Sequence, residues 1–140
     1  MQAQEFICRN LTDTQAMAEK IAQMASPGKC FALYGNLGYG KTTFTKFFVK
    51  SLNSEIAEVI SPTFNIVCTY SSDRGEIWHI DCYRLKSADE IQELGLEEAF
   101  ASCICVIEWP EIIEKYLPND AVKIKFEKSN DILKISIKTL

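Results

Sequence analysis

The chain has little histidine and lacks the ligand spacings of zinc sites. It has one histidine and six cysteines, and no Cys-x-x-Cys pair occurs. Structural zinc normally requires a full set of Cys and His ligands at short, regular spacings. The cysteines lie instead in apolar, strand-like runs, which is typical of reduced thiols that pack as small hydrophobic groups. The sequence therefore argues against a zinc site and against a disulfide framework.

Long hydrophobic runs are also missing. No apolar stretch approaches the roughly 18 residues needed to span a membrane. Residues 1–6 lack the basic segment and apolar segment of a secretory signal. We therefore expect a cytoplasmic protein without a membrane partner.

Positively charged residues are fewer than negatively charged ones, and few of them are arginines. The formal net charge is −4, and the arginines are Arg9, Arg74 and Arg84. Strong binding to nucleic acid normally requires a basic surface, so any action on RNA is expected to be indirect and to involve partner proteins. Kinases usually use several arginines to clamp the second substrate and the transferred phosphoryl group. A small-molecule kinase is therefore the less favoured of the nucleotide-dependent enzymes.

The residues that are present indicate one globular domain over residues 1–140. Apolar residues make up 47% of the chain and charged residues 24%, which is ordinary for a folded protein of this length. The apolar run 30–34 predicts a central strand covered on both faces, as in parallel sheets. Other predicted strands are 6–8, 65–70, 76–83, 103–107, 122–126 and 133–137. Helices are expected after capping boxes at Thr12–Gln15 and Ser87–Glu90, and from Lys41 onward.

A phosphate-binding loop follows the run 30–34. Gly35, Gly40, Lys41 and Thr42 satisfy the pattern G-x-x-x-x-G-K-[ST], and an apolar stripe at helical spacing follows them. Glycines let backbone N–H groups approach phosphate oxygens, and the start of the helix adds a positive dipole end. The lysine reaches the β- and γ-phosphates, and the threonine hydroxyl ligates Mg²⁺.

Acidic residues stand near the ends of two predicted strands. Glu108 directly follows the apolar run 103–107, which is typical of the carboxylate that contacts Mg²⁺ beside a phosphate loop. A solvent-facing strand end is the alternative. Asp81 is a candidate for holding a metal-bound water or orienting a nucleophile, although a salt bridge to Arg84 or a turn cap would also explain it. His79 shares a strand face with Asp81 and is more simply explained as a structural residue.

Two further features leave their roles open. Thr63 lies in a loop behind Pro62 and ahead of a strand, a position where switch-type nucleotidases place a γ-phosphate sensor. The terminal strands 122–126 and 133–137 alternate cleanly and predict a hairpin. Its polar face carries Lys123, Lys125, Lys134 and Lys138. That face is either simply solvated or docks an acidic partner, RNA or phosphate.

Five motifs occur in order along the chain: residues 35–43, 61–64, 79–84, 93–96 and 107–110. Together they resemble the TsaE family, formerly called YjeE, whose members are small bacterial ATPases needed for threonylcarbamoyladenosine formation on tRNA. The resemblance implies an α/β P-loop NTPase fold, three-layered, with a mixed parallel and antiparallel central sheet and a C-terminal β-hairpin.

The resemblance also implies a set of site residues. Thr42 and Glu108 are expected at the metal, and Thr63, Asp81 and Glu108 in hydrolysis or in sensing the γ-phosphate. ATP and Mg²⁺ are the implied cofactors, with nucleotide contacts from Gly35, Gly38, Tyr39, Gly40, Lys41, Thr42 and Thr43. Asn36 and Tyr39 depart from the family, which usually has Asp and a small residue at these positions.

The implied partners are proteins of the TsaD and TsaB type. TsaD carries the transferase site in this family, and hydrolysis by TsaE is thought to reset the complex. We therefore expect weak ATPase activity from the isolated chain and stimulation by the partners. A regulatory GTPase is disfavoured because no N-K-x-D guanine motif is present. A scaffold that only binds nucleotide stays open, as does the kinase.

Overall fold

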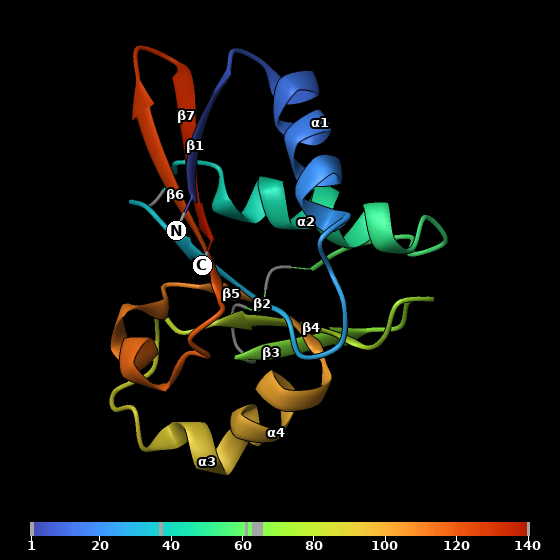
Figure 1. Ribbon diagram of the computed structural model, residues 1–140, viewed down its shortest axis with the longest axis vertical. Helices are drawn as coiled ribbons and strands as arrows, with labels where there is room; N and C mark the ends of the chain where they lie inside the picture. Colours follow the sequence, from blue (N-terminus) through green and yellow to red (C-terminus); the bar gives the residue numbers. More distant parts are fainter. Residues whose placement is uncertain (1, 37, 61, 63–65, 140) are drawn as a thin grey trace.

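A single seven-stranded sheet forms the centre of the protein, with helices on both faces (Figure 1). The computed structural model describes residues 2–36, 38–60, 62 and 66–139. The strand order is β1-β7-β6-β2-β5-β4-β3. The strands are β1 Gln2–Cys8, β2 Cys30–Tyr34, β3 Val67–Tyr70, β4 Ile77–Asp81, β5 Ile104–Glu108, β6 Val122–Ser129 and β7 Ile132–Thr139. The helices are α1 Leu11–Ala22, α2 Lys41–Leu52, α3 Glu90–Leu94, α4 Leu96–Ser102 and the 3₁₀ helix η1 Pro110–Tyr116.

Strand β2 lies at the middle of the sheet and is parallel to both of its neighbours, β5 and β6. The side chains from Cys30 to Leu33 have no exposed surface. A parallel strand covered by helices on both faces needs this continuous apolar character. The predicted central strand is therefore confirmed, and its carboxyl end delivers the chain to the phosphate loop.

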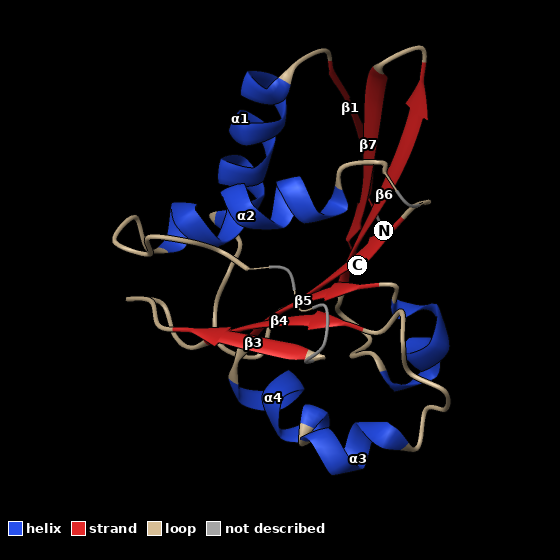
Figure 2. Ribbon diagram, turned by 180° about the vertical axis from the view of Figure 1, so that it is seen from behind, coloured by secondary structure: helices blue, strands red, loops and turns tan. Residues whose placement is uncertain are grey.

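Antiparallel pairs extend the sheet at both sides (Figure 2). β3 and β4 form the predicted hairpin, and β6 and β7 form the predicted terminal hairpin. β1 pairs along its whole length with β7, so the first and last strands of the chain are neighbours. The mixed α/β sheet and the C-terminal hairpin are thus confirmed, whereas the pairing of β1 was not predicted.

Two apolar cores lie on opposite faces of the sheet. One lies under α1 and α2, where the expected stripe of α2 buries Phe44 and Phe48 completely. The rings of Phe48 and Phe44 meet strand residues Phe31 and Phe126 edge to face, at centroid distances of 5.0 and 5.4 Å. Such pairs add about 1 kcal/mol each beyond their buried area. These contacts hold α2, and with it the phosphate loop, against the sheet.

Helix α1 does not begin where the sequence predicted. The N-cap is Asn10 rather than Thr12, because the Asn10 Oδ1 accepts a hydrogen bond of 2.8 Å from the Asp13 N–H. The Asp13 carboxylate in turn accepts from the Arg9 N–H. Asn is as good a cap as Thr, so the expected box at Thr12–Gln15 was wrong by two residues. At the second expected box, the Glu90 carboxylate accepts from the Ser87 N–H, but α3 begins at Glu90 with Asp89 as its N-cap and without a side-chain cap, so Ser87 is not the N-cap that the sequence predicted.

The four hairpin lysines share one face of the sheet, as expected. Lys123 lies opposite Lys138, and Lys134 lies opposite Glu127. The Lys134 Nζ is 3.7 Å from Glu127 and 4.0 Å from Glu5. Carboxylates therefore balance part of this charge, and docking of an anion here stays a hypothesis.

Among the described residues, no helix has both the length and the apolar character to cross a membrane.

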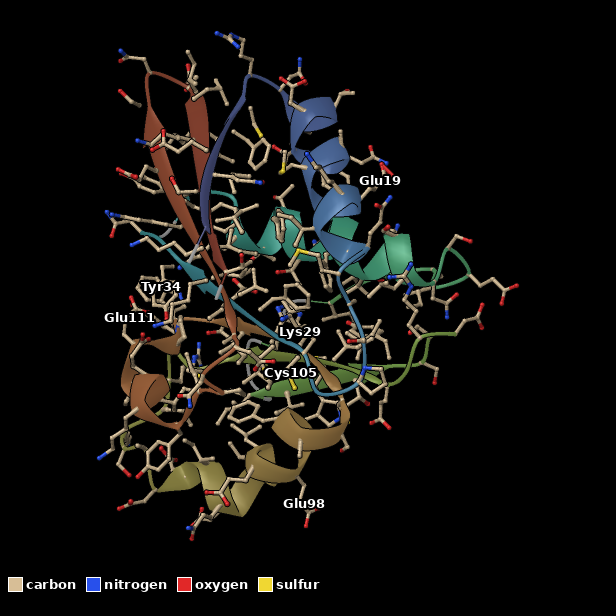
Figure 3. All side chains as sticks on the ribbon, in the orientation of Figure 1. Glu19, Lys29, Tyr34, Glu98, Cys105 and Glu111 are labelled. Carbon is tan, nitrogen blue, oxygen red and sulfur yellow. The ribbon has the colours of Figure 1, made fainter. Side chains whose placement is uncertain are left out.

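Hydrogen bonds at the Glu114 carboxylate connect helix η1 to the sheet. This carboxylate accepts hydrogen bonds from the Tyr34 hydroxyl at 2.5 Å and from the Lys123 ammonium at 2.6 Å. Tyr34 and η1 residue Glu111 lie close together in Figure 3. Partial burial works to raise the pKa of Glu114, but the hydrogen bonds from Lys123 and Tyr34 and the charge of Lys123 lower it below 4.5. The ionised carboxylate is thus favoured by folding.

Replacing Glu114 with glutamine should lower the free energy of unfolding at pH 7 by about 0.5 to 1 kcal/mol, a small value because both partners are partly exposed. A carboxyl with a lowered pKa stabilises the fold above its unfolded pKa, and this contribution disappears as pH falls through the folded pKa. Urea unfolding at a series of pH values measures the effect. The exposed Glu111→Gln is the control. A difference that persists undiminished in strong acid would rule out the ionic origin.

Candidate active site

The phosphate loop connects the carboxyl end of β2 to the start of α2. Gly35 has a φ of 152°, and a Cβ placed there would lie 2.8 Å from the carbonyl oxygen of Phe126 on β6. Gly38 has a φ of 80°, and a Cβ there would meet no atom of the described residues within 4 Å. The first glycine is required by the neighbouring strand. The second leaves open space above the backbone, which is the cradle that a phosphate needs.

Helix α2 begins at Lys41, with Gly40 as its N-cap. Glycine has no side chain with which to cap, so the first N–H groups of the helix are left for a ligand. The positive end of the helix dipole lies at the same point. This end of α2 therefore suits an anion.

The Lys41 side chain is folded back into the protein and is only 4% exposed. Its ammonium donates to the carbonyl oxygen of Gly35 and lies 3.5 Å from the centre of the Trp109 ring. Burial lowers the pKa of Lys41, while the negative charges of Glu108, Glu111 and Asp81 act in the opposite direction. In the structure the Lys41 ammonium contacts a carbonyl oxygen and an aromatic face. A bound phosphate would offer it a fully charged partner, and hydrogen bonds between charged groups are stronger than those between neutral groups.

Glu108 is buried at the end of β5, with 3% of its surface exposed. One carboxylate oxygen accepts a 3.0 Å hydrogen bond from the Thr42 hydroxyl, and the other lies 2.5 Å from the His79 Nε2. The alternative of a solvent-facing strand end is therefore wrong. The structure brings together Thr42 and Glu108, the two residues predicted at the metal.

His79 is a buried, hydrogen-bonded structural residue, as predicted, but the sequence did not identify its partner. It is completely buried on β4, and within the described part of the chain its Nδ1 has no hydrogen-bond partner. The His79 Nε2 contacts one carboxylate oxygen of Glu108, and the other oxygen accepts the hydrogen bond from the Thr42 hydroxyl. The alternation along β4 placed His79 and Asp81 on one face, but only the pairing of β4 with β5 shows that Glu108 is their neighbour.

Asp81 ends β4 directly beside Glu108 in the parallel register. Its Oδ1 accepts a 2.9 Å hydrogen bond from the Tyr83 N–H, so it also caps the turn that follows. Burial raises the pKa of Asp81, the Tyr83 N–H lowers it, and the Glu108 charge raises it again. Two neighbouring carboxylates repel each other, and a cation between or near them offsets this repulsion.

These groups line a cavity of about 340 Å³. Its residues are Gly38, Gly40, Lys41, Thr42, Thr43, Asp81, Glu108 and Trp109. The donor atoms near the Thr42–Glu108 pair are oxygens, which Mg²⁺ prefers. Within the described residues no group of three or more His, Cys, Asp or Glu side chains forms a metal cluster. An ion held by few protein oxygens suits Mg²⁺, which usually keeps waters and phosphate oxygens as its other ligands. Thr63 lies outside the described residues, so its expected place at the γ-phosphate stays a prediction.

Replacing His79 with alanine should lower the free energy of unfolding by about 3 kcal/mol, because it leaves a buried carboxylate without its strongest partner. For the nucleotide hydrolysis that the sequence predicts, turnover should also fall about tenfold, since Glu108 would no longer be held toward Thr42. Urea unfolding and steady-state phosphate release measure the two effects. His79→Gln, whose amide can still donate to Glu108, should recover part of both. An alanine variant as stable as the parent chain would show that the contact contributes nothing.

Comparison with known proteins gives a consistent result. A sequence model of the family "Threonylcarbamoyl adenosine biosynthesis protein TsaE" matches residues 8–135. The tRNA threonylcarbamoyladenosine biosynthesis protein TsaE of Rickettsia bellii is 39% identical over 127 residues, which are 91% of this chain and 88% of that protein. The protein of the same name from Bacillus subtilis is 39% identical and covers 87% of this chain and 76% of its own length. The crystal structure of Bacillus subtilis YdiB superposes with a TM-score of 0.77 at 29% identity, covering 99% of this chain and 86% of YdiB.

Proposed function

The chain belongs to the TsaE family of tRNA threonylcarbamoyladenosine biosynthesis, and from that premise we propose that its contribution is Mg²⁺-dependent hydrolysis of ATP. The observation that carries the proposal is the contact between Thr42, at the start of α2, and the buried Glu108 at the end of β5. A hydroxyl and a carboxylate at hydrogen-bond distance beside a phosphate loop are the pair that holds Mg²⁺ in P-loop NTPases. We accordingly assign the chain to the P-loop NTPase fold.

Most residues of the cavity have a part in this proposal. Gly38, Gly40 and the first N–H groups of α2 bind the phosphates, and Lys41 pairs with the β- and γ-phosphates. Thr42 and Glu108 hold Mg²⁺, which when bound neutralises charge on the phosphates and positions them. Asp81 orients the attacking water, and Thr63 contacts the γ-phosphate. His79 positions Glu108 without touching the nucleotide.

Partners are needed because the chain supplies little positive charge to the transferring phosphoryl group. No arginine is among the described residues that line the catalytic cavity. Arg74 is bound at the end of α1, where it donates to the Gln23 carbonyl at 2.8 Å. An arginine at the γ-phosphate accelerates such reactions by orders of magnitude, and partners often provide it. We propose that proteins of the TsaD and TsaB type stimulate the ATPase, that hydrolysis resets their complex, and that tRNA meets the chain only through them.

Steady-state phosphate release from ATP by the purified chain, with and without its TsaD and TsaB partners, tests the proposal. We expect slow release alone and stimulation of at least about tenfold by the pair, abolished by EDTA and not reproduced with GTP. Absence of ATP-dependent phosphate release under all these conditions would overturn the ATPase. Transfer of phosphate to an added small molecule would instead support the kinase.

A further inference from the structure

A cavity of about 440 Å³ lies between η1, the start of β6 and the end of β7. The end of the chain and η1 lie side by side in Figures 1 and 2. The start of β6 pairs with the first half of β2, whereas the phosphate loop follows the end of that strand. None of the described residues that line this cavity also lines the catalytic cavity. We call it the lysine cavity, and its lining includes Lys115, Leu117, Pro118, Ala121, Lys123 and Lys138.

The rim of the lysine cavity is cationic, although the chain has a net charge of −4. Its three lysines are accompanied by a single carboxylate among the described lining residues, Glu114. This carboxylate is already occupied, because it accepts from the Tyr34 hydroxyl and the Lys123 ammonium. Within the described residues, neither Lys115 nor Lys138 forms an ion pair with a carboxylate. Two cations at the cavity are therefore left without a counter-charge.

The register of the terminal hairpin adds repulsion between these lysines. Lys123 on β6 lies directly opposite Lys138 on β7, and both side chains are exposed. Like charges that face each other across an antiparallel pair destabilise it. An anion bound between η1 and the hairpin would offset this repulsion.

The floor of the lysine cavity is apolar. Leu117 and Ala121 are 9% and 4% exposed, and Pro118 is half-buried. An apolar centre with a polar rim is typical of surfaces that bind proteins. A short acidic peptide segment matches both parts, since its carboxylates would reach the lysines while an apolar side chain contacts Leu117.

Nucleic acid matches this surface less well. Single-stranded bases are normally held by aromatic side chains or arginines, and neither is among the described residues that line the cavity. A phosphate backbone requires a continuous basic track. Carboxylates interrupt the track here, because Lys134 lies 3.7 Å from Glu127 and 4.0 Å from Glu5. The observations therefore favour an acidic protein segment.

We propose that the lysine cavity binds an acidic segment of a partner protein, with carboxylates at Lys115 and Lys138 and an apolar side chain on Leu117. The proposal rests on the partnership with proteins of the TsaD and TsaB type proposed above, and it adds the surface that one of them contacts. Because the lysine cavity lies away from the phosphate loop, the partner stays bound while nucleotide enters and leaves. Attraction between the opposite charges should increase the association rate.

The first test measures association of the TsaD and TsaB pair with the parent chain, Lys138→Glu and Lys50→Glu by biolayer interferometry. Lys138→Glu should lower the association rate constant about tenfold at low salt, and the difference should shrink below about twofold in about 0.5 M NaCl. Lys50 is an exposed residue near the end of α2 and does not line the lysine cavity. Lys50→Glu changes the net charge equally and should behave as the parent chain.

An unchanged association rate in Lys138→Glu would overturn the proposal, and an equal loss in Lys50→Glu would do the same by attributing the effect to net charge. Loss of tRNA binding in Lys138→Glu with unchanged binding of the pair would overturn it in favour of RNA. A parent chain that does not bind the pair would refute the partnership, and the inference with it. Phosphate release by the isolated parent chain tests the ATPase separately.

The second test identifies the contact directly. A carbodiimide joins an ammonium group to a carboxylate that touches it, and mass spectrometry of the treated complex identifies the linked residues. The link between Lys123 and Glu114, whose charged atoms are 2.6 Å apart, is the internal control. Links from Lys115 or Lys138 to an acidic residue of the TsaD or TsaB protein would support the proposal. Links only between copies of this chain, or none at these two lysines while the control link forms, would overturn it.

Discussion

Replacing Lys41 with alanine is expected to weaken ATP binding by about a hundredfold and to abolish phosphate release. The Lys41 ammonium is the cation of the phosphate loop, and it is already held beside Gly35 by a hydrogen bond to the carbonyl oxygen. A charge-assisted hydrogen bond to phosphate contributes about 1.5 to 3 kcal/mol, which corresponds to roughly a tenfold to hundredfold change in affinity. Calorimetric titration of ATP, with the unfolding midpoint recorded in parallel, separates loss of binding from loss of folding.

Lys46→Ala is the matched control for this experiment. Lys46 is an exposed residue of the same helix and does not line the catalytic cavity. Its removal should change ATP affinity less than about twofold, since exposed charges at a distance are screened by salt. If Lys41→Ala and Lys46→Ala had the same affinity, Lys41 would have no special role at the phosphates, and the assignment of the loop would be wrong.

Replacing Glu108 with glutamine is expected to lower kcat by about a hundredfold to a thousandfold while changing ATP affinity by less than about threefold. Glutamine keeps the size and the hydrogen-bonding reach of the side chain but removes the negative charge that we propose holds Mg²⁺. Loss of one preorganised electrostatic contact in a buried site typically costs this much in rate. Binding should persist because the phosphate contacts proposed for Lys41, Gly38 and Gly40 are unchanged in this variant.

Phosphate release at a series of Mg²⁺ concentrations measures the effect of Glu108→Gln. The concentration that gives half-maximal rate should increase in this variant. Glu97→Gln, which is exposed on α4 and does not line the catalytic cavity, should behave as the parent chain. Unchanged hydrolysis with normal Mg²⁺ dependence in Glu108→Gln would refute the metal assignment.

Local patterns in the sequence were sufficient for the elements that surround the catalytic cavity. The run Cys30 to Tyr34 was identified as a central strand because both of its faces are apolar, and the structure places β2 there between two parallel neighbours. The stripe through Phe44 and Phe48 and the loop pattern ahead of Lys41 likewise depend on neighbouring residues alone. The error at the start of α1 has a local cause as well, since Asn10 and Thr12 are both good caps and their propensities differ little.

From the sequence alone we could identify the strand that precedes the phosphate loop, the loop itself, both hairpins and the acidic residues at the strand ends. Each of these depends on backbone propensity and on periodicity over a few residues. Tertiary packing was needed to pair β1 with β7, to bring His79 to Glu108 and to place Lys41 under Trp109. It also formed a cavity of about 300 Å³ beside the phosphate loop from three segments distant in the chain. Such contacts depend on which strands become neighbours, which the packing of the whole chain decides rather than the propensity of any one segment.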